Sequence, residues 1–312
     1  MQHLRTTFDI PDRATLERLL HRAQHLKRRR AERRLAPTLS GRVVGMLFEK
    51  ASTRTRPSLE AGVALLGGAT VVLHARDAHA LGEEHEPLRD AARVLGSYVD
   101  ALVARMRSHA DLEELARHAR VSVVNGQSEL DHPCQVVTDL FTVFERKERP
   151  FETRWAYVGE ARGTANGLVA LAALTGIELA MALPEGSALD AQTLARARAA
   201  GARVTVGHDP QAAVRDAGVV STEAWTSLSA LEPSARAARV AALTPLQVND
   251  ALLSHAADDA VVLHPLPARR GQEITDDALE GMRSVAFQQA GNRLCVQQAL
   301  LEWLLGVPAE AA

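Results

Sequence analysis

The sequence predicts an α/β protein with two doubly wound domains, each built on a mainly parallel sheet. Short apolar runs alternate with segments of helical spacing along most of the chain, a pattern typical of parallel sheets covered by helices. The chain has 312 residues, which is enough for two domains of ordinary size. A charged stretch that contains Pro150 marks the boundary between them. We therefore predict a first domain at 1–145, a second at 146–290 and a C-terminal helix at 291–312.

The first half of the chain begins with a helix and continues with strands and helices in alternation. At 11–34, leucines recur at helical spacing, and the basic run from Lys27 to Arg30 is interpreted as a solvated helix face. Binding of an anion or of nucleic acid is the less favoured alternative for that run. The later elements are expected as a strand at 42–48, a helix closed by Gly67 and Gly68, a strand at 70–73, a helix at 88–97 and a strand at 99–105.

The second half repeats the alternation of strands and helices. Strands are expected at 155–158, 177–183, 203–206, 218–221, 261–264 and 284–287, with helical patterns between most of them. The last helix, at about 292–305, is strongly apolar, which indicates wide packing. We expect this helix to pack back on the first domain.

Composition and charge exclude several classes of protein. The chain is 46% hydrophobic and 24% charged, as in an ordinary globular protein. Its net charge of -2 favours neither a nucleic-acid nor a membrane partner. The only two cysteines, Cys134 and Cys295, argue against a disulfide framework. The N-terminus lacks the apolar region of a signal peptide, and the apolar runs are too short to span a bilayer. We therefore predict a soluble, cytoplasmic protein.

The most informative segment, residues 48–57, reads F-E-K-A-S-T-R-T-R-P and separates an expected strand from an expected helix. Backbone N–H groups and the helix dipole form an anion site at such a junction. Hydroxyl and guanidinium groups suited to phosphate are added by Ser52, Thr53, Arg54, Thr55 and Arg56. The segment therefore predicts a phosphate site, with a helix cap and two surface arginines as the alternative. It lacks the glycines and the G-K-[ST] ending of a nucleotide-hydrolysing loop.

This segment resembles the carbamoyl-phosphate loop, F-x-K-x-S-T-R-T-R, of the aspartate and ornithine carbamoyltransferase family. Further family motifs follow in the same order, and the resemblance covers nearly the whole chain. They are the D-T-A-R-V-L-G segment at 90–96 with Arg105 after it, H-P-x-Q at 132–135, H-x-L-P at 264–267, and N-R-L at 292–294. The resemblance implies an enzyme that transfers the carbamoyl group of carbamoyl phosphate to an amine and releases phosphate.

The resemblance also implies roles for individual residues on the donor side. Donors aimed at the carbonyl oxygen, where charge develops, would be Thr55, Arg105 and His132. The phosphate would be bound by Ser52, Thr53, Arg54 and Thr55, with Arg105 bridging phosphate and carbonyl. Gln135 and the backbone carbonyl of Leu266 would bind the carbamoyl nitrogen, and Arg293 the carbamoyl oxygen. The alternatives are an ordinary buried histidine at 132 and surface arginines at 105 and 293.

The acceptor region departs from the ornithine branch of the family. Residues 159–167 read G-E-A-R-G-T-A-N-G, so Arg162 and Gly163 replace paired asparagines, and the guanidinium of Arg162 is suited to a carboxylate. A dinucleotide site is disfavoured there because G-x-G-x-x-G is absent. At 223–229, Glu223 replaces an aspartate and is a candidate partner for a substrate ammonium. Further acceptor-binding candidates are Ser227, Leu228 (which replaces a methionine) and Pro265 (which replaces the cysteine of H-C-L-P).

We therefore predict an active carbamoyltransferase whose acceptor is ornithine or a related amino acid or diamine, with a citrulline-like ureido product and arginine biosynthesis as a candidate pathway. The alternatives are an aspartate-type acceptor, or a catalytically quiet paralogue that binds anions or acts through assembly. No metal or cofactor is expected, because the G-E-E-H-E run at 82–86 lacks zinc spacing. This loop is interpreted as mobile, and in the family its equivalent completes a neighbouring subunit's site. The resemblance implies a homotrimer or a multiple of trimers.

Overall fold

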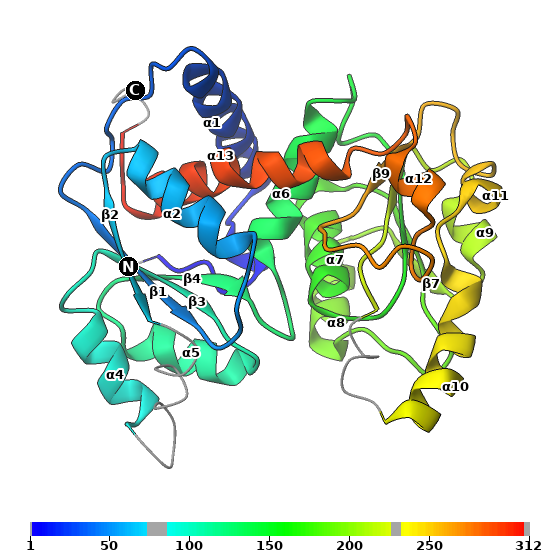
Figure 1. The fold of residues 1–312 in the computed structure, drawn as a ribbon, viewed down its shortest axis with the longest axis horizontal. Helices are drawn as coiled ribbons and strands as arrows, with labels where there is room; N and C mark the ends of the chain where they lie inside the picture. The colour runs from blue at the N-terminus through cyan, green and yellow to red at the C-terminus, as the bar shows by residue number, and fades with distance from the viewer. Residues whose placement is uncertain (1, 74–85, 226–231, 309–312) are drawn as a thin grey trace. The chain divides into compact units, whose positions relative to one another are not determined.

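The computed structural model describes residues 2–73, 86–225 and 232–308 (Figure 1). The chain divides into two compact units: unit 1 comprises Met1–Phe141 and Asn292–Ala312, and unit 2 comprises Thr142–Gly291. Each unit holds a parallel sheet with helices, so the predicted α/β class with two parallel-sheet domains is confirmed. Within the described ranges, no helix is long and apolar enough to cross a membrane.

Unit 1 is built on a four-stranded parallel sheet in the order β2-β1-β3-β4. The strands are β1 (Val43–Phe48), β2 (Ala69–Leu73), β3 (Ala101–Arg105) and β4 (Ser122–Gln127). The inner strands β1 and β3 are almost entirely buried, which explains why they read as continuous apolar runs. Strand β4 and the helix before it were not anticipated from the sequence. In β4, Asn125 and Gly126 interrupt the apolar pattern.

Helices cover both faces of the unit 1 sheet (Figure 1). One face packs against α4 (Leu88–Leu95) and α5 (His109–His118) through a core that includes Leu47, Leu102 and Ala104. Because side chains alternate along a strand, Phe48 and Arg105 point to the opposite face. The remaining helices of the unit are η1 (Thr7–Asp9), α1 (Arg13–Ala31), α2 (Thr55–Leu65) and parts of α6 (Pro133–Phe144) and α13 (Ala286–Leu304).

The C-terminal helix packs on unit 1, as predicted. Glu302 accepts hydrogen bonds from Arg22 Nε at 2.6 Å and from Thr38 Oγ1 at 2.5 Å. The side-chain nitrogen of Gln298 donates to the Gly62 carbonyl at 2.9 Å. A Cβ on Gly62 would lie 3.2 Å from Gln298 Cγ, so the glycine permits this close approach.

The predicted start of that helix is wrong, and so is the strand expected at 284–287. Helix α13 begins at Ala286, and Ser284 forms only an isolated bridge with Val262. A short apolar run does not distinguish a strand from the first turn of a buried helix, which explains the error. As a consequence, Asn292 and Arg293 lie inside the helix rather than at its start.

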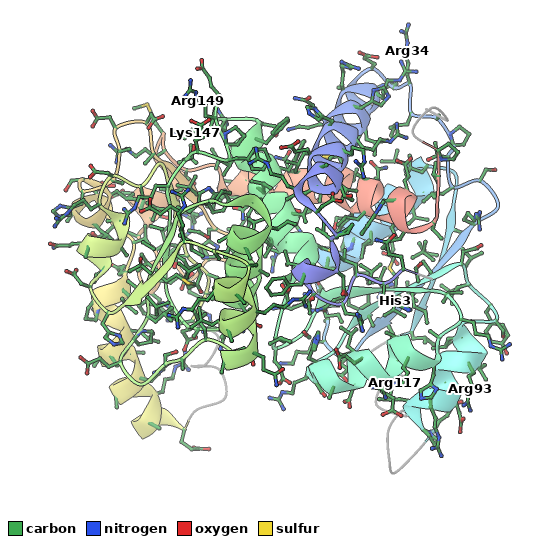
Figure 2. All side chains as sticks on the ribbon, turned by 180° about the vertical axis from the view of Figure 1, so that it is seen from behind. His3, Arg34, Arg93, Arg117, Lys147 and Arg149 are labelled. Atoms are coloured by element: carbon green, nitrogen blue, oxygen red, sulfur yellow. The ribbon has the colours of Figure 1, made fainter. Side chains whose placement is uncertain are left out.

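The basic run in α1 is only partly a solvated face. Arg28 and Arg30 are exposed, and Arg34 lies just beyond the helix at the surface (Figure 2). Lys27, by contrast, donates from Nζ to Asn292 Oδ1 at 2.7 Å, and its ammonium lies 5.8 Å from the centre of the Phe141 ring. Lys27 therefore helps to fasten α1 to α13.

Unit 2 is built on a five-stranded parallel sheet in the order β7-β6-β5-β8-β9. The strands are β5 (Trp155–Val158), β6 (Leu179–Ala182), β7 (Val204–Gly207), β8 (Val219–Ser221) and β9 (Val261–Leu263). The chain starts at β5, builds outward on one side and then on the other, so β5 lies at the switch point where open α/β sheets bind ligands.

The helices of unit 2 also lie on both faces of its sheet (Figure 1). They are α7 (Gly163–Thr175), α8 (Ala191–Ala199), α9 (Pro210–Val214), α10 (Pro233–Leu243), η3 (Thr244–Leu246), α11 (Asp250–Leu253) and α12 (Asp276–Glu280). Ala156 and Val158 of β5 face the core that contains Trp225 and residues of α9, α11 and α12. Tyr157 therefore faces the opposite side of the sheet.

Candidate active site

The predicted phosphate loop connects β1 to α2 in unit 1. Helix α2 begins at Thr55, and its N-cap residue Arg54 makes no side-chain capping bond. Ser52 serves instead, because its Oγ accepts a hydrogen bond from the Thr55 N–H at 2.9 Å. Arg54 Nη1 donates to Thr53 Oγ1 at 3.2 Å. Hydroxyl and guanidinium groups thus surround the positive end of a helix, where anions bind.

Two guanidinium groups converge on the hydroxyl of Thr55. Arg105 Nη1 donates to Thr55 Oγ1 at 3.2 Å, and Arg293 Nη2 donates to the same atom at 2.6 Å. Arg105 ends β3 beside Phe48 of β1, while Arg293 reaches the site from α13. A hydroxyl that accepts two hydrogen bonds keeps its own proton free to donate. Thr55 is therefore arranged to donate to a ligand.

The cationic side chains of this cluster depress one another's pKa. Burial lowers the pKa of Arg105 to about 10, and the charge of Arg54 adds to the effect. Burial also lowers the pKa of Arg293 to about 10, with Arg105 and Arg54 contributing. Such a concentration of buried positive charge is relieved by an anion. A buried cluster of this kind is therefore able to bind an anion.

His132 and Gln135 flank the start of α6. Burial, and then the charges of Arg293 and Arg105, hold the pKa of His132 well below its ordinary value, so the imidazole is neutral at neutral pH. Its Nδ1 is buried without a hydrogen-bond partner in the structure as described. Gln135 donates from Nε2 to Asp139 Oδ1 at 2.6 Å, and its Oε1 is also buried without a partner. Gln135 therefore presents an acceptor, as a ligand N–H requires.

A buried carboxylate fixes the backbone at His132. Asp131 accepts hydrogen bonds from the His132 N–H at 2.6 Å, the Thr7 N–H at 2.6 Å and Thr7 Oγ1 at 3.2 Å. Burial raises the pKa of Asp131 to about 7. The N-terminal segment that carries Thr7 is itself attached to β4, because Leu4 bridges Val124. Asp131 thus connects the chain's N-terminal segment to a predicted catalytic residue.

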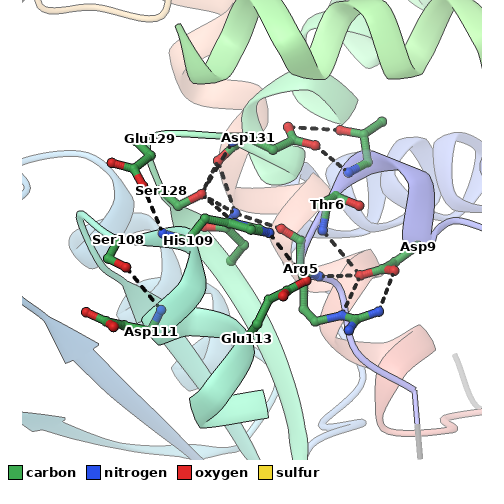
Figure 3. Close-up of polar contacts among 12 residues, drawn as sticks. Arg5, Thr6, Asp9, Ser108, His109, Asp111, Glu113, Ser128, Glu129 and Asp131 are labelled. Carbon is green, nitrogen blue, oxygen red and sulfur yellow. Dashed lines mark hydrogen bonds and ion pairs between the residues drawn. The ribbon is translucent and has the colours of Figure 1, made fainter. Parts of the chain in front are cut away.

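The loop that leads to His132 is held by further polar contacts (Figure 3). His109 Nδ1 lies 2.9 Å from Ser128 Oγ, and Arg5 forms an ion pair with Asp9 at 3.0 Å. The side-chain amide of Asn125 donates to the Arg5 carbonyl at 2.7 Å and to the Asp131 carbonyl at 3.0 Å. Sequence reasoning missed this network, for which the acidic residue directly before the H-P-x-Q motif was the only local signal.

On the acceptor side, in unit 2, the carboxylate of Glu223 is hydrogen-bonded to two hydroxyl groups. Thr164 Oγ1 donates to Oε2 at 2.8 Å, and Tyr157 Oη donates to Oε1 at 3.2 Å. The single proton of Tyr157 Oη is shared between two acceptors, because the same oxygen also lies 2.8 Å from the Glu160 carbonyl, which is the shorter of its two contacts. Burial raises the pKa of Glu223, against the opposite effect of the two hydroxyl donors. Sequence reasoning identified Glu223 but neither of its hydroxyl partners.

Arg162 stands at the N-cap of α7, and Gly163 is the first residue of that helix. The Arg162 side chain is 50% exposed, and its Nε lies 3.8 Å from the buried Glu160 carboxylate. Glu160 makes its shorter contact with Arg239 Nη2 of α10, at 3.0 Å. Arg162 is thus held loosely enough to bind another carboxylate.

The H-x-L-P loop follows β9 and is held by a buried pair. His264 Nδ1 accepts from the Leu266 N–H at 2.9 Å, so Nε2 carries the ring proton and faces Glu273 Oε1 at 3.0 Å. Both side chains of the pair are fully buried. Leu266 has a φ of +52°, which is uncommon for a non-glycine residue, and a cis peptide bond joins it to Pro267. The pair therefore holds the segment that includes Pro265 and Leu266.

Comparisons with known proteins decide the family. Residues 2–145 match the family model "Aspartate/ornithine carbamoyltransferase, carbamoyl-P binding domain", and residues 152–304 match "Aspartate/ornithine carbamoyltransferase, Asp/Orn binding domain". The chain belongs to the aspartate/ornithine carbamoyltransferase family. The predicted family and enzyme class, a carbamoyltransferase, are therefore confirmed.

Curated relatives and solved structures of this family cover almost the entire chain. The chain is 40% identical over 310 residues to the ornithine carbamoyltransferase of Archaeoglobus fulgidus, which covers 99% of each chain. It is 44% identical over 290 residues to that of Methanoculleus marisnigri, with 93% of each chain covered. The solved structure of the ornithine carbamoyltransferase from Pyrococcus furiosus superposes with a TM-score of 0.92 at 35% identity and covers 98% of this chain and 97% of that one.

The structure of this carbamoyltransferase brings Thr55, Arg105 and Arg293 into direct contact. It contradicts the alternative of a surface arginine at 293, because that residue is only 3% exposed. The predicted donor-side residues lie in unit 1 except Leu266, which lies with the predicted acceptor-side residues in unit 2. Ser227, Leu228 and most of the 75–86 loop lie outside the described residues.

Proposed function

We propose that this carbamoyltransferase moves the carbamoyl group of carbamoyl phosphate to the δ-amine of ornithine, which yields citrulline and phosphate. The observation that carries the proposal is the convergence of Arg105 and Arg293 on the Thr55 hydroxyl at the N-terminus of α2. This arrangement suits an acyl phosphate, in which the phosphate group and the polarised carbonyl oxygen both need hydrogen-bond donors. Ornithine is supported as the acceptor by relatives of that name that match the chain over nearly its full length.

Donor binding is assigned to unit 1. Ser52, Thr53, Arg54 and Thr55 bind the phosphate, and Arg105 extends from the phosphate to the carbonyl. Thr55, Arg105 and His132 stabilise the charge that develops on the carbonyl oxygen, with Arg293 as a further contact. His132 does so as a neutral hydrogen-bond donor, because its pKa is held well below the ordinary value by burial and by the neighbouring guanidinium groups.

The carbamoyl nitrogen needs acceptors, because an amide NH₂ only donates. Gln135 Oε1 supplies one, since Asp139 occupies the other end of the glutamine amide. The backbone carbonyl of Leu266 is proposed as the second. The first assignment rests on the unpartnered Gln135 oxygen together with the family motif, and the second on the family motif.

Acceptor binding is assigned to unit 2. Arg162 binds the α-carboxylate of ornithine, and Glu223 binds its α-ammonium group. Gly163, Ser227, Leu228 and Pro265 are proposed to border the bound acceptor. Proline has no titratable group, so residue 265 cannot take the proton that the attacking amine loses.

A panel of amines tests the proposal. Purified protein is incubated with carbamoyl phosphate and ornithine, acetylornithine, putrescine, aspartate or lysine, and both phosphate release and ureido product are measured. We expect citrulline with ornithine, and a loss of carbamoyl-phosphate binding in Arg54→Ala. Turnover with another amine alone would replace ornithine as the acceptor. Calorimetric binding of carbamoyl phosphate without turnover on any amine would instead support a quiet, anion-binding paralogue.

We also propose a homotrimer or a multiple of trimers. Large apolar side chains of unit 1 are exposed and are candidates for contacts between subunits. They are Leu65, Val71, Val94 and Tyr98, with exposed fractions from 41% to 68%. Light scattering that gives three times the 33.6 kDa chain mass, or a multiple of it, is the expected result, and a monomer would contradict the proposal. A cytoplasmic location and a role in arginine biosynthesis stay predictions.

A further inference from the structure

Both oxygens of the Glu223 carboxylate are hydrogen-bonded within unit 2. We infer that Thr164 and Tyr157 are positioning residues that hold this carboxylate in the orientation that binds the ammonium group of the acceptor. The inference rests on the proposed function, because it takes Glu223 as the ammonium-binding residue. It adds two residues that the sequence motifs did not single out.

Three different elements bring these side chains together. Tyr157 lies in β5, Thr164 is the second residue of α7, and Glu223 follows β8. Strands β5 and β8 are hydrogen-bonded neighbours, with Tyr157 opposite Ser221. The three groups therefore meet at the carboxyl ends of adjacent parallel strands, on the side of the sheet that α7 covers. Open α/β sheets bind their ligands at this edge.

Hydrogen-bond capacity explains why the carboxylate stays able to bind a cation. An ionised carboxylate has about four acceptor positions, and the hydroxyls of Thr164 and Tyr157 use one on each oxygen. The remaining positions are available to an ammonium group, which has only donors. Glutamate has one more rotatable bond than aspartate, so two restraints on its carboxylate reduce the entropy that binding must remove.

The hydroxyl groups also favour the charged form of Glu223. Burial raises its pKa, while the bonds from Thr164 and Tyr157 act in the opposite direction. The other charged groups that face it are Arg162, which lowers its pKa, and Glu160, which raises it. Arg239 partly neutralises Glu160 from α10. Removal of a hydroxyl donor should therefore raise the pKa of Glu223 further and weaken cation binding at mildly acidic pH.

Thr164 offers the cleaner substitution. Thr164→Val preserves the shape of the side chain and removes only the donor, whereas Thr164→Ser retains the donor. Tyr157→Phe also breaks the bond to the Glu160 carbonyl, so its effect includes a change in the backbone after β5. Glu223→Gln is the reference variant, because it removes the charge at the centre of the arrangement.

The experiment measures binding of norvaline, which is ornithine without the δ-amine and therefore cannot react. Calorimetry in the presence of carbamoyl phosphate gives the dissociation constant from about pH 5.5 to pH 8.5, a range in which norvaline itself does not titrate appreciably. For Thr164→Val we expect a dissociation constant about tenfold higher at neutral pH. We also expect the loss of norvaline affinity at low pH to begin at a higher pH than in the wild type. For Thr164→Ser we expect wild-type affinity within about twofold. Tyr157→Phe should weaken binding in the same direction.

Carbamoyl-phosphate affinity and the circular dichroism spectrum serve as controls for folding, because the predicted donor residues Ser52 to Thr55 lie in unit 1. The inference would be overturned if Thr164→Val bound norvaline as the wild type does, with the same loss of affinity at low pH, while Glu223→Gln bound it more weakly. That result would leave the proposed function intact. Unchanged binding in Glu223→Gln would overturn both the inference and the assigned role of Glu223. If the wild type binds another amine of the panel instead of norvaline, ornithine is wrong, and the same variants test the inference with that amine.

Discussion

Asp131 offers the most stringent test of how the structure supports His132. Its carboxylate accepts from two backbone N–H groups and one hydroxyl, at distances of 2.6 to 3.2 Å. Asp131→Asn replaces one oxygen by an NH₂ group. Whichever way the amide turns, one of the two backbone N–H groups, of Thr7 or of His132, then faces a donor. Loss of that acceptor costs about 1–3 kcal/mol.

The pH dependence of this cost has a definite sign. Burial raises the pKa of Asp131 from 3.8 to about 7, so the folded protein binds this proton more tightly than the unfolded chain does. The stability that the wild type gains from the proton is complete below the unfolded pKa and is lost as the pH rises toward 7. Between about pH 5 and pH 8 the loss amounts to roughly 2–3 kcal/mol, at 1.36 kcal/mol per pKa unit. The asparagine side chain does not titrate, so the variant's free energy of unfolding does not include this loss.

We therefore expect Asp131→Asn to be less stable than the wild type at about pH 5 and to gain relative stability as the pH rises. Urea unfolding followed by circular dichroism at several pH values measures the difference. Glu129→Gln is the matched control, because it neutralises an exposed carboxylate in the same loop, which only receives a bond from the His109 N–H at 3.3 Å. A stability difference for Asp131→Asn that does not change with pH would refute the reasoning.

Four further predictions test other parts of the molecule. Thr55→Val removes the hydroxyl that Arg105 and Arg293 contact and should lower kcat by about 10²–10³, whereas Thr55→Ser should retain most activity in a citrulline assay. Arg293→Lys should reduce kcat/KM at least tenfold in the same assay, because one ammonium cannot replace a planar fork; wild-type activity would exclude the role assigned to Arg293. His264→Ala removes one donor to the buried Glu273 carboxylate and leaves the Arg269 N–H, so it should cost about 3 kcal/mol, seen as a fall of several degrees in Tm; an unchanged Tm would contradict it. Tyr98→Glu places a charge at an exposed aromatic position of unit 1 and should shift sedimentation from trimer toward monomer, with an unaltered trimer excluding Tyr98 from the interface.

The local geometry of the predicted phosphate loop could be anticipated because its parts are contiguous in sequence. Residues 48–57 contain the end of a strand, the loop and the start of a helix, so the positive helix end and the hydroxyl donors follow from local rules. The position of Arg105 at the carboxyl end of a strand was equally readable. The contact between Arg105 and Thr55 could not be predicted from the sequence, because this contact depends on which face of the sheet α2 covers.

The error at Arg293 arose from a misplaced helix start, and the omissions arose where distant segments meet. A helix that began near residue 292 would leave Arg293 at the surface. Helix α13 instead begins at Ala286, so Arg293 lies in a buried turn of the helix. The partners of Glu223 are 59 and 66 residues away from it, and Thr7 is 124 residues away from Asp131. No periodicity or motif encodes such pairs, since each depends on the packing of elements that are separate in the sequence.

By itself, the sequence determined the α/β class and the family of this protein, and it predicted a phosphate loop. These features follow from the alternation of apolar runs and from motifs a few residues long, which act through local backbone geometry. Only the tertiary structure showed which groups orient the candidate site. Arg293 is hydrogen-bonded to Thr55, Asp131 to the backbone of His132, and Thr164 to Glu223. Burial is the physical reason, because it makes an unpaired polar group costly and so requires partners from elements that are remote in the chain.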